Sequence, residues 1–217
     1  DDSTPALVKG TDYEVSYVLN GEEVEEPVNA GTYTVVIKGI GNYKGTVNAE
    51  NLTYTIEQKE ITADMVTVDT TEKESTGAAI EPEVTVKDGD KVLVEGVDYK
   101  VSYENNVNAS EEAIVRIDGL GNYNDNRKIK FTIVPKSVNS ADITALVEPT
   151  SVEYTGSAIT VNLTVKDGEK VLVEGTDFGT EYVNNINVGT ATIKVTGLNN
   201  YKDVKEVTFE ITPVDIT

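Results

Sequence analysis

The chain repeats itself, and this constrains its fold more than any other feature. One segment begins "GTDYEVSY", "GVDYKVSY" and "GTDFGTEY" in its three copies, at Gly10, Gly96 and Gly175. A second segment reads "GIGNYKG", "GLGNYND" and "GLNNYKD", at Gly39, Gly119 and Gly197. Because both segments recur in the same order, the chain is built from copies of one structural unit. The fold of that unit must therefore be small.

The repeats divide the chain into three predicted modules, 1–58, 59–135 and 136–217, the last of which includes a short linker tail. The first copy begins at the residues that match "DKVLVEGVDY" and lacks counterparts of Thr62 to Lys87. We expect that either a boundary falls inside this module or another segment supplies its missing strands. The opening "DDSTPALVKG" is typical of the middle of a longer protein.

The spacing of apolar residues predicts β-strands throughout. Apolar and polar residues alternate in five segments of the second module, and Gly, Asn and Asp separate these segments. The segments read "PEVTVKD", "KVLVEG", "YKVSYEN", "EAIVRIDG" and "KIKFTIVP". No stretch keeps a helical period for three turns, and "NSADITALVE" predicts only one short helical turn, opened by Ser140 or Asp142.

We therefore predict an all-β fold of tandem, small antiparallel β-sandwich modules. A β-grasp-like module with little helix is the alternative, and the sandwich is preferred because no segment supplies the helix of a grasp. The linkers "IEQKEITAD" and "IVPKSVNSAD" are short and contain no Gly. The modules are accordingly expected to lie end to end with limited hinge freedom.

Composition excludes several kinds of function. The chain has 18 basic and 38 acidic residues, a formal net charge of −20, and this field repels nucleic acid and anionic membranes. It contains no His and no Cys, which removes Ser-His and Cys-His nucleophiles, His-based metal sites and thiol chemistry. No apolar run is long enough for membrane insertion. We expect no enzyme activity, no cofactor, and no catalytic or metal-binding residues.

The aromatic residues follow the repeat. Twelve of the 14 fall into four columns, which favours shared core positions over one unique binding site. Tyr123 lies within a turn, and we predict that its ring plugs the edge of the core while its hydroxyl bonds a backbone group across the turn. A platform for stacking a sugar is the alternative. In the same turns, Gly119 and Gly197 are predicted to need a positive φ.

Two groups of acidic residues raise the question of ligand binding. Asp88 and Asp90 in "VKDGDK" have the oxygen ligands that calcium prefers, but "DG" between alternating segments favours a β-hairpin. A second group, which precedes an aromatic in every copy, is Asp12, Asp98 and Asp177. Their carboxylates are predicted to accept local backbone N–H bonds and fix a turn. Ligand binding is the alternative.

The third module carries a family resemblance, from "YTGSAITVNLTVKDGEKVLVEGTDF" at Tyr154 to "VTFEITP". It resembles the tandem repeats of large bacterial cell-surface and secreted proteins of Gram-positive bacteria, described as Ig-like or mostly β-grasp repeats. The second module matches nearly as well, with Ser110 in place of the usual Gly. The first matches only from "LVKGTDY" onward and has an insertion, "VLNGEEVEEP".

This resemblance implies an extracellular protein, secreted or attached to the cell wall. The implied function is a non-catalytic stalk that projects a functional domain from the cell, and the implied partners are neighbouring repeats of the same chain in a monomer. The alternative function is that of an adhesin module that binds a glycan or a host surface protein. The insertion in the first module is the best candidate for such a binding surface.

Overall fold

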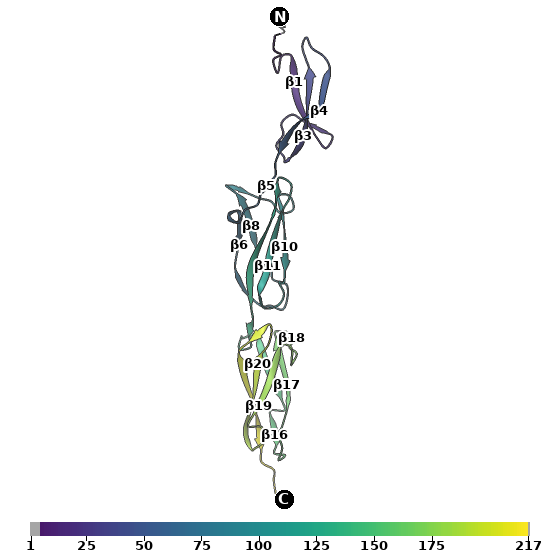
Figure 1. Ribbon diagram of the computed structural model, residues 1–217. Coiled ribbons are helices and arrows are strands. Elements are labelled where there is room, and N and C mark those ends of the chain that lie inside the picture. The colour runs from purple at the N-terminus through teal and green to yellow at the C-terminus, as the bar shows by residue number, and fades with distance from the viewer. Residues whose placement is uncertain (1–4, 217) are drawn as a thin grey trace. The chain divides into compact units, whose positions relative to one another are not determined.

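The computed structural model describes residues 5–216, with the side chains of residues 49 and 50 left aside, and consists of β-strands joined by turns (Figure 1). The single helical segment in this range is a 3-10 turn, η1 (Ala63–Met65). The sheets are small and mostly antiparallel. The prediction of an all-β fold made of several small β modules is therefore confirmed.

The chain forms two compact units. The first contains residues up to 67 together with 84–102 and 116–128, and the second contains 68–83, 103–115 and the residues from 129 onward. These boundaries do not follow the sequence repeats, so the division into three modules stays a prediction from the repeats. We call each copy of the sequence pattern a repeat.

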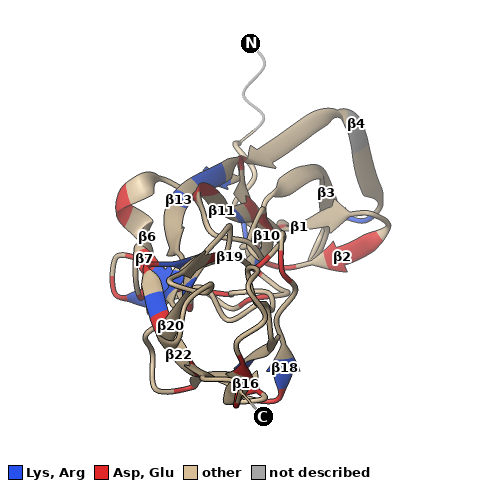
Figure 2. Ribbon diagram, turned by 90° about the horizontal axis from the view of Figure 1, so that it is seen from below, with Lys and Arg blue, Asp and Glu red and all other residues tan. Residues whose placement is uncertain are grey.

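The first repeat forms a four-stranded antiparallel sheet in the order β2-β1-β3-β4. Its strands are β1 (Tyr13–Leu19), β2 (Glu22–Val24), β3 (Gly31–Gly39) and β4 (Thr46–Ile56). The insertion folds as a hairpin, because Asn20 and Gly21 both adopt positive φ values, 54° and 89°, between β1 and β2. The acidic strand β2 is marked red in Figure 2.

The second repeat forms three sheets, in the orders β6-β8-β9, β10-β11-β13-β7 and β12-β5. The strands in the first unit include β5 (Lys59–Glu60), β8 (Val84–Asp88), β9 (Lys91–Val92) and β12 (Tyr123–Asn124). The remaining strands lie partly or wholly in the second unit. They are β6 (Val66–Val68), β7 (Glu72–Glu74), β10 (Tyr99–Glu104), β11 (Ser110–Gly119) and β13 (Asn126–Val134). Each of the five predicted alternating segments contributes a strand.

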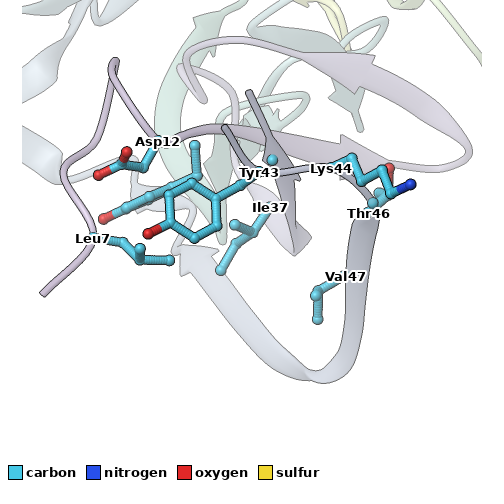
Figure 3. A pocket seen from close by; sticks show the side chains of 10 residues that line it. Leu7, Asp12, Ile37, Tyr43, Lys44, Thr46 and Val47 are labelled. Carbon is cyan, nitrogen blue, oxygen red and sulfur yellow. The ribbon is translucent and has the colours of Figure 1, made fainter. Parts of the chain in front are cut away.

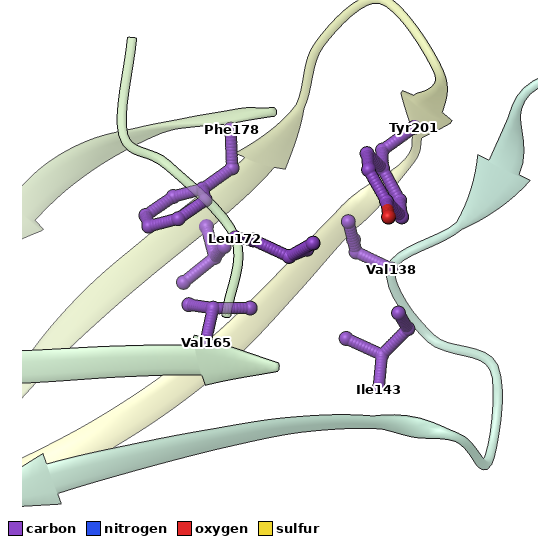
Figure 4. Close-up of a cluster of buried hydrophobic side chains, with 7 residues drawn as sticks. Val138, Ile143, Val165, Leu172, Phe178 and Tyr201 are labelled. Carbon is purple, nitrogen blue, oxygen red and sulfur yellow. The ribbon is translucent and has the colours of Figure 1, made fainter. Parts of the chain in front are cut away.

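The third repeat has two sheets that share one core. The sheet β15-β17-β18 contains Ile143–Glu148, Asn162–Asp167 and Lys170–Val171. The sheet β16-β22-β20-β19 contains Ser151–Glu153, Val204–Thr212, Gly189–Gly197 and Phe178–Val183. A short third sheet pairs β14 (Lys136–Ser137) with β21 (Tyr201–Lys202). Figure 4 shows side chains from both larger sheets pointing toward one another.

Two predictions about secondary structure need correction. The segment predicted as a helical turn after Ser140 contains the strand β15, which pairs with β17 over all six of its residues. The sheets are also not purely antiparallel, because four short pairs are parallel: β5–β12, β7–β13, β14–β21 and β16–β22. A parallel pair needs a long crossover, so strand patterns alone did not reveal it.

The prediction of positive φ at Gly119 and Gly197 is wrong. Other residues of these segments are left-handed: Gly121 and Asp125, with φ 58° and 68°, and Asn199 and Asp203, with φ 54° and 70°. Gly119 and Gly197 are needed for close approach instead. A Cβ on Gly119 would lie 2.7 Å from the carbonyl oxygen of Asn124, and a Cβ on Gly197 would lie 2.5 Å from the backbone nitrogen of Lys202.

Candidate functional site

The turn tyrosines of the second and third repeats are buried. Tyr123 and Tyr201 pack their rings inside, as predicted, but their hydroxyls do not bond backbone groups. Each lies close to a carboxylate: 3.1 Å from Oδ2 of Asp88 in one repeat and 3.2 Å from Oδ2 of Asp167 in the other. Burial, followed by the neighbouring carboxylate, raises the pKa of both tyrosines. The hydroxyls therefore stay protonated and donate.

The same two carboxylates bind a lysine from the short strand at the start of each repeat, β5 or β14, which lies within the linker. Nζ of Lys59 lies 2.5 Å from Oδ1 of Asp88, and Nζ of Lys136 lies 2.7 Å from Oδ1 of Asp167. The bond to Asp88 raises the pKa of Lys59, and the bond to Lys59 lowers the pKa of Asp88. The bond to Asp167 likewise raises the pKa of Lys136. Each lysine, aspartate and tyrosine thus forms a triad that joins three chain segments.

The backbone fastens the linker strand to the same turn. In the second repeat, the N–H of Lys59 donates to the carbonyl of Asn122 at 2.9 Å and the N–H of Ile61 to that of Asn124 at 3.2 Å. In the third repeat, the corresponding bonds run from Lys136 to Asn200 at 2.8 Å and from Val138 to Lys202 at 2.9 Å. The side chains of Ile61 and Val138 are fully buried, which anchors each linker in the repeat that follows it.

An asparagine in each turn binds the loop of the preceding repeat. Oδ1 of Asn122 accepts the N–H of Ala30 at 2.6 Å, and its Nδ2 donates to Oδ1 of Asn29 at 3.1 Å. These residues all lie in the first unit. The asparagine thereby connects two repeats through both ends of its amide.

The same bonds recur in the second unit. Oδ1 of Asn200 accepts the N–H of Ala109 at 2.7 Å, and its Nδ2 donates to Oδ1 of Asn108 at 2.9 Å. We call the turn asparagine, its partner loop, the linker strand and the lysine–aspartate–tyrosine triad the joint. The joint occurs twice, with the same residue types at the same repeat positions.

A further lysine covers each turn tyrosine. Nζ of Lys91 lies 5.2 Å from the ring centroid of Tyr123, and Nζ of Lys170 lies 5.6 Å from that of Tyr201. Both distances are within the range of a cation–π contact. The rings are therefore closed off from solvent on this side by charged side chains, which disfavours their use as a platform for a sugar.

The recurring aspartates fix turns, as predicted. The carboxylates of Asp12, Asp98 and Asp177 each accept a backbone N–H four residues earlier, from Val8, Val94 and Val173, always at 2.9 Å. These bonds close the turn that leads into the first, second and third copies of the same strand.

The "DG" segment of the second repeat is a hairpin, as predicted, because Asp88 pairs with Lys91 across Gly89, whose φ is 58°. Asp88 is engaged by the joint and not by a neighbouring acid. Among the side chains that the structure describes, no group of three or more acidic residues lies close enough together to hold a metal ion.

The sequence reasoning missed the lysines and the asparagines of the joint. Both residue types nevertheless recur at fixed positions in the sequence. A lysine follows each linker start in "EQK" and "VPK", and an asparagine precedes each turn tyrosine. What the repeats did not reveal is that residues about 30 and 90 positions apart meet.

Comparisons with protein-family models, with curated proteins and with solved structures found no match. No helix among the described residues is long and apolar enough to cross a membrane.

Proposed function

We propose that the chain is a non-catalytic spacer of an extracellular bacterial surface protein and projects a functional domain away from the cell wall. In this proposal the repeats are Ig-like sandwiches that follow one another end to end. The observation that carries the proposal is the joint, which occurs twice with the same residue types. A spacer needs each connection between repeats to be the same.

The geometry of the joint supports limited hinge motion. Each joint has two side-chain bonds to the preceding loop, and each such bond contributes a net stability of about 0.5–1.5 kcal/mol. The linker that carries the lysine is paired on the following turn and has a buried apolar anchor. The segment left to bend between two repeats is therefore short. The charge of −20 disfavours close association of parallel chains on a crowded surface.

Small-angle X-ray scattering tests this function. A stiff particle of about 100 Å, unchanged by calcium, is the expected result. The double variant Asn122→Ala and Asn200→Ala should broaden the distance distribution, whereas Asn42→Ala should leave it unchanged, because the side chain of Asn42 makes no hydrogen bond among the described residues. A compact wild-type particle would refute the spacer.

The second candidate is an adhesin module for a glycan or a host protein. It is favoured by the acidic insertion of the first repeat, which lies at the sheet edge as β2 and borders an open groove of about 890 Å³. Glu23, Glu25, Glu26 and Lys38 line this groove. A glycan array with the full chain tests this candidate, and binding that is lost when residues 20–26 are replaced by a short turn would favour it over the spacer.

A further inference from the structure

The first repeat leaves one side of its sheet open. Three of its apolar side chains, Leu7, Tyr43 and Tyr54, are exposed to 48%, 43% and 49%. At the same repeat positions, Leu172, Tyr201 and Phe209 of the third repeat are exposed to only 4%, 5% and 1%. The residues are apolar or aromatic in both repeats. The difference in exposure therefore comes from the strands that lie over them in the third repeat and, among the described residues, not in the first.

In the third repeat, a second sheet covers these positions. Val138, Ile143, Val165 and Leu172 form one buried cluster with Phe178, Val195 and Tyr201. Figure 4 shows Val165 and Ile143 on strands of one sheet, facing Phe178 and Tyr201 on the other side of the core. The covering strands β15 and β17 precede the strands that they cover. The first repeat has no counterpart of these two strands within the described residues.

The open side contains an apolar groove of about 420 Å³. Leu7, Ile37, Tyr43 and Val47 line it, with Asp12 and Lys44 at its borders (Figure 3). Exposed apolar surface at positions that form the core elsewhere in the same chain indicates a missing partner.

We propose that this face binds a segment of several short β-strands. The sequence pattern of this segment matches residues 136–173, the part of the third repeat that contains its covering strands. Such a segment places Val and Ile side chains over Leu7 and Ile37 of the groove. It also carries an aspartate, at the position of Asp167, that can accept a hydrogen bond from the hydroxyl of Tyr43. This hydroxyl makes no hydrogen bond to any described residue. The inference does not depend on the spacer function.

The sheet edge provides a second point of recognition. In the third repeat, β16 pairs in parallel with Glu210–Thr212 at the edge of its sheet. The counterpart stretch of the first repeat lies at the end of β4, which is the edge strand of that sheet. The incoming segment would therefore add a short parallel strand beside Thr55 and Ile56.

One residue restricts the shape of the partner. Tyr33 occupies the position of Ala191 and is already buried, with its ring 6.5 Å from that of Tyr17 and 6.5 Å from that of Tyr54. Its hydroxyl donates to the carbonyl of Asn29 at 2.7 Å. The covering segment consequently needs smaller side chains here than Val147 and Ile159, which cluster with Ala191 in the third repeat.

A test of the inference is hydrogen exchange of the full chain with a synthetic peptide of residues 136–173, in which Val147 and Ile159 are replaced by Ala to leave room for Tyr33. We expect the peptide to slow the exchange of amides in β3 and β4 by about tenfold, without a change in the third repeat, whose face is covered. Leu7→Asp should abolish this protection. It alters an exposed side chain, and circular dichroism would verify that the fold is kept.

Matched controls make the test specific. Val97→Asp replaces an apolar residue that is more exposed than Leu7 and lies away from the groove, and it should leave the protection unchanged. A peptide carrying the counterpart of Val165→Asp should not protect the chain. The inference is overturned if the peptide with these two Ala replacements and no charged substitution gives no protection. It is also overturned if protection of β4 appears without peptide and grows with protein concentration, because a second copy of the chain would then be the occupant.

Discussion

Replacing one asparagine tests whether the joint acts as a cooperative structure. Asn200→Ala removes two hydrogen bonds, of 2.7 Å to the N–H of Ala109 and 2.9 Å to Oδ1 of Asn108. At a net contribution of about 0.5–1.5 kcal/mol for each bond, the closed joint loses about 1–3 kcal/mol of stability. This corresponds to an increase of about 5- to 150-fold in the population of the open joint.

The amides of Lys136 and Val138 provide the measurement, by hydrogen exchange detected with NMR. Their acceptors are the backbone carbonyls of Asn200 and Lys202, which the substitution leaves in place. If the joint opens as a whole, both amides exchange faster in the variant by the factor above. Asn42→Ala is the matched control, because it removes the same side chain at the same repeat position without breaking a joint.

A local effect would refute this reasoning. If the exchange of the Ala109 amide accelerates while that of Lys136 and Val138 stays unchanged, the contact to the preceding loop is independent of the linker. The repeats would then be connected only by a flexible contact, and the joint could not stiffen a spacer.

Three further predictions concern pH and packing. The pKa of Asp88 is lowered from its ordinary 3.8, so its bond to the linker lysine stabilises the joint above that value and is lost as the pH falls through the lower folded pKa; the titration of the linker amides by NMR measures this loss. Phe209→Ala should cost about 3–5 kcal/mol in urea denaturation because the ring is buried, whereas Tyr54→Ala, at the same position of the open repeat, should cost less than half as much. Gly197→Ala should lower the melting temperature, because the new Cβ meets backbone at 2.5 Å, whereas Gly179→Ala makes only an ordinary contact at 3.9 Å and should not; a melting temperature that falls equally for both would contradict the close-approach explanation.

The strands and the local turns were predictable from the sequence because their causes are local. Alternation of apolar residues gave the five strand segments of the second repeat, and the aspartate turns at Asp98 and Asp177 involve residues only four positions apart. The burial of Tyr123 and Tyr201 was predictable from the repeat columns. In each case the residues that determine the structure are close in sequence or recur at fixed positions.

The joint was not predictable because its parts are distant in sequence. Tyr201 meets a carboxylate 34 positions earlier, and Asn200 meets a loop about 90 positions earlier, in another repeat. Gly119 shows a related limit. The sequence suggested that a glycine was needed at this position. A positive φ and a close approach of backbone atoms both select glycine, so the residue type alone does not distinguish the two causes.

Each full repeat carries both complementary halves of the joint. The second repeat offers the loop of Asn108 and Ala109 to the repeat after it and uses Asn122 to bind the loop of the repeat before it. The third repeat contains the equivalent loop residues, Asn187 and Val188. A unit that is compatible with itself in this way can be gained or lost by gene duplication or recombination without any new interface having to evolve. The number of copies in such an array can therefore change while every junction keeps its chemistry.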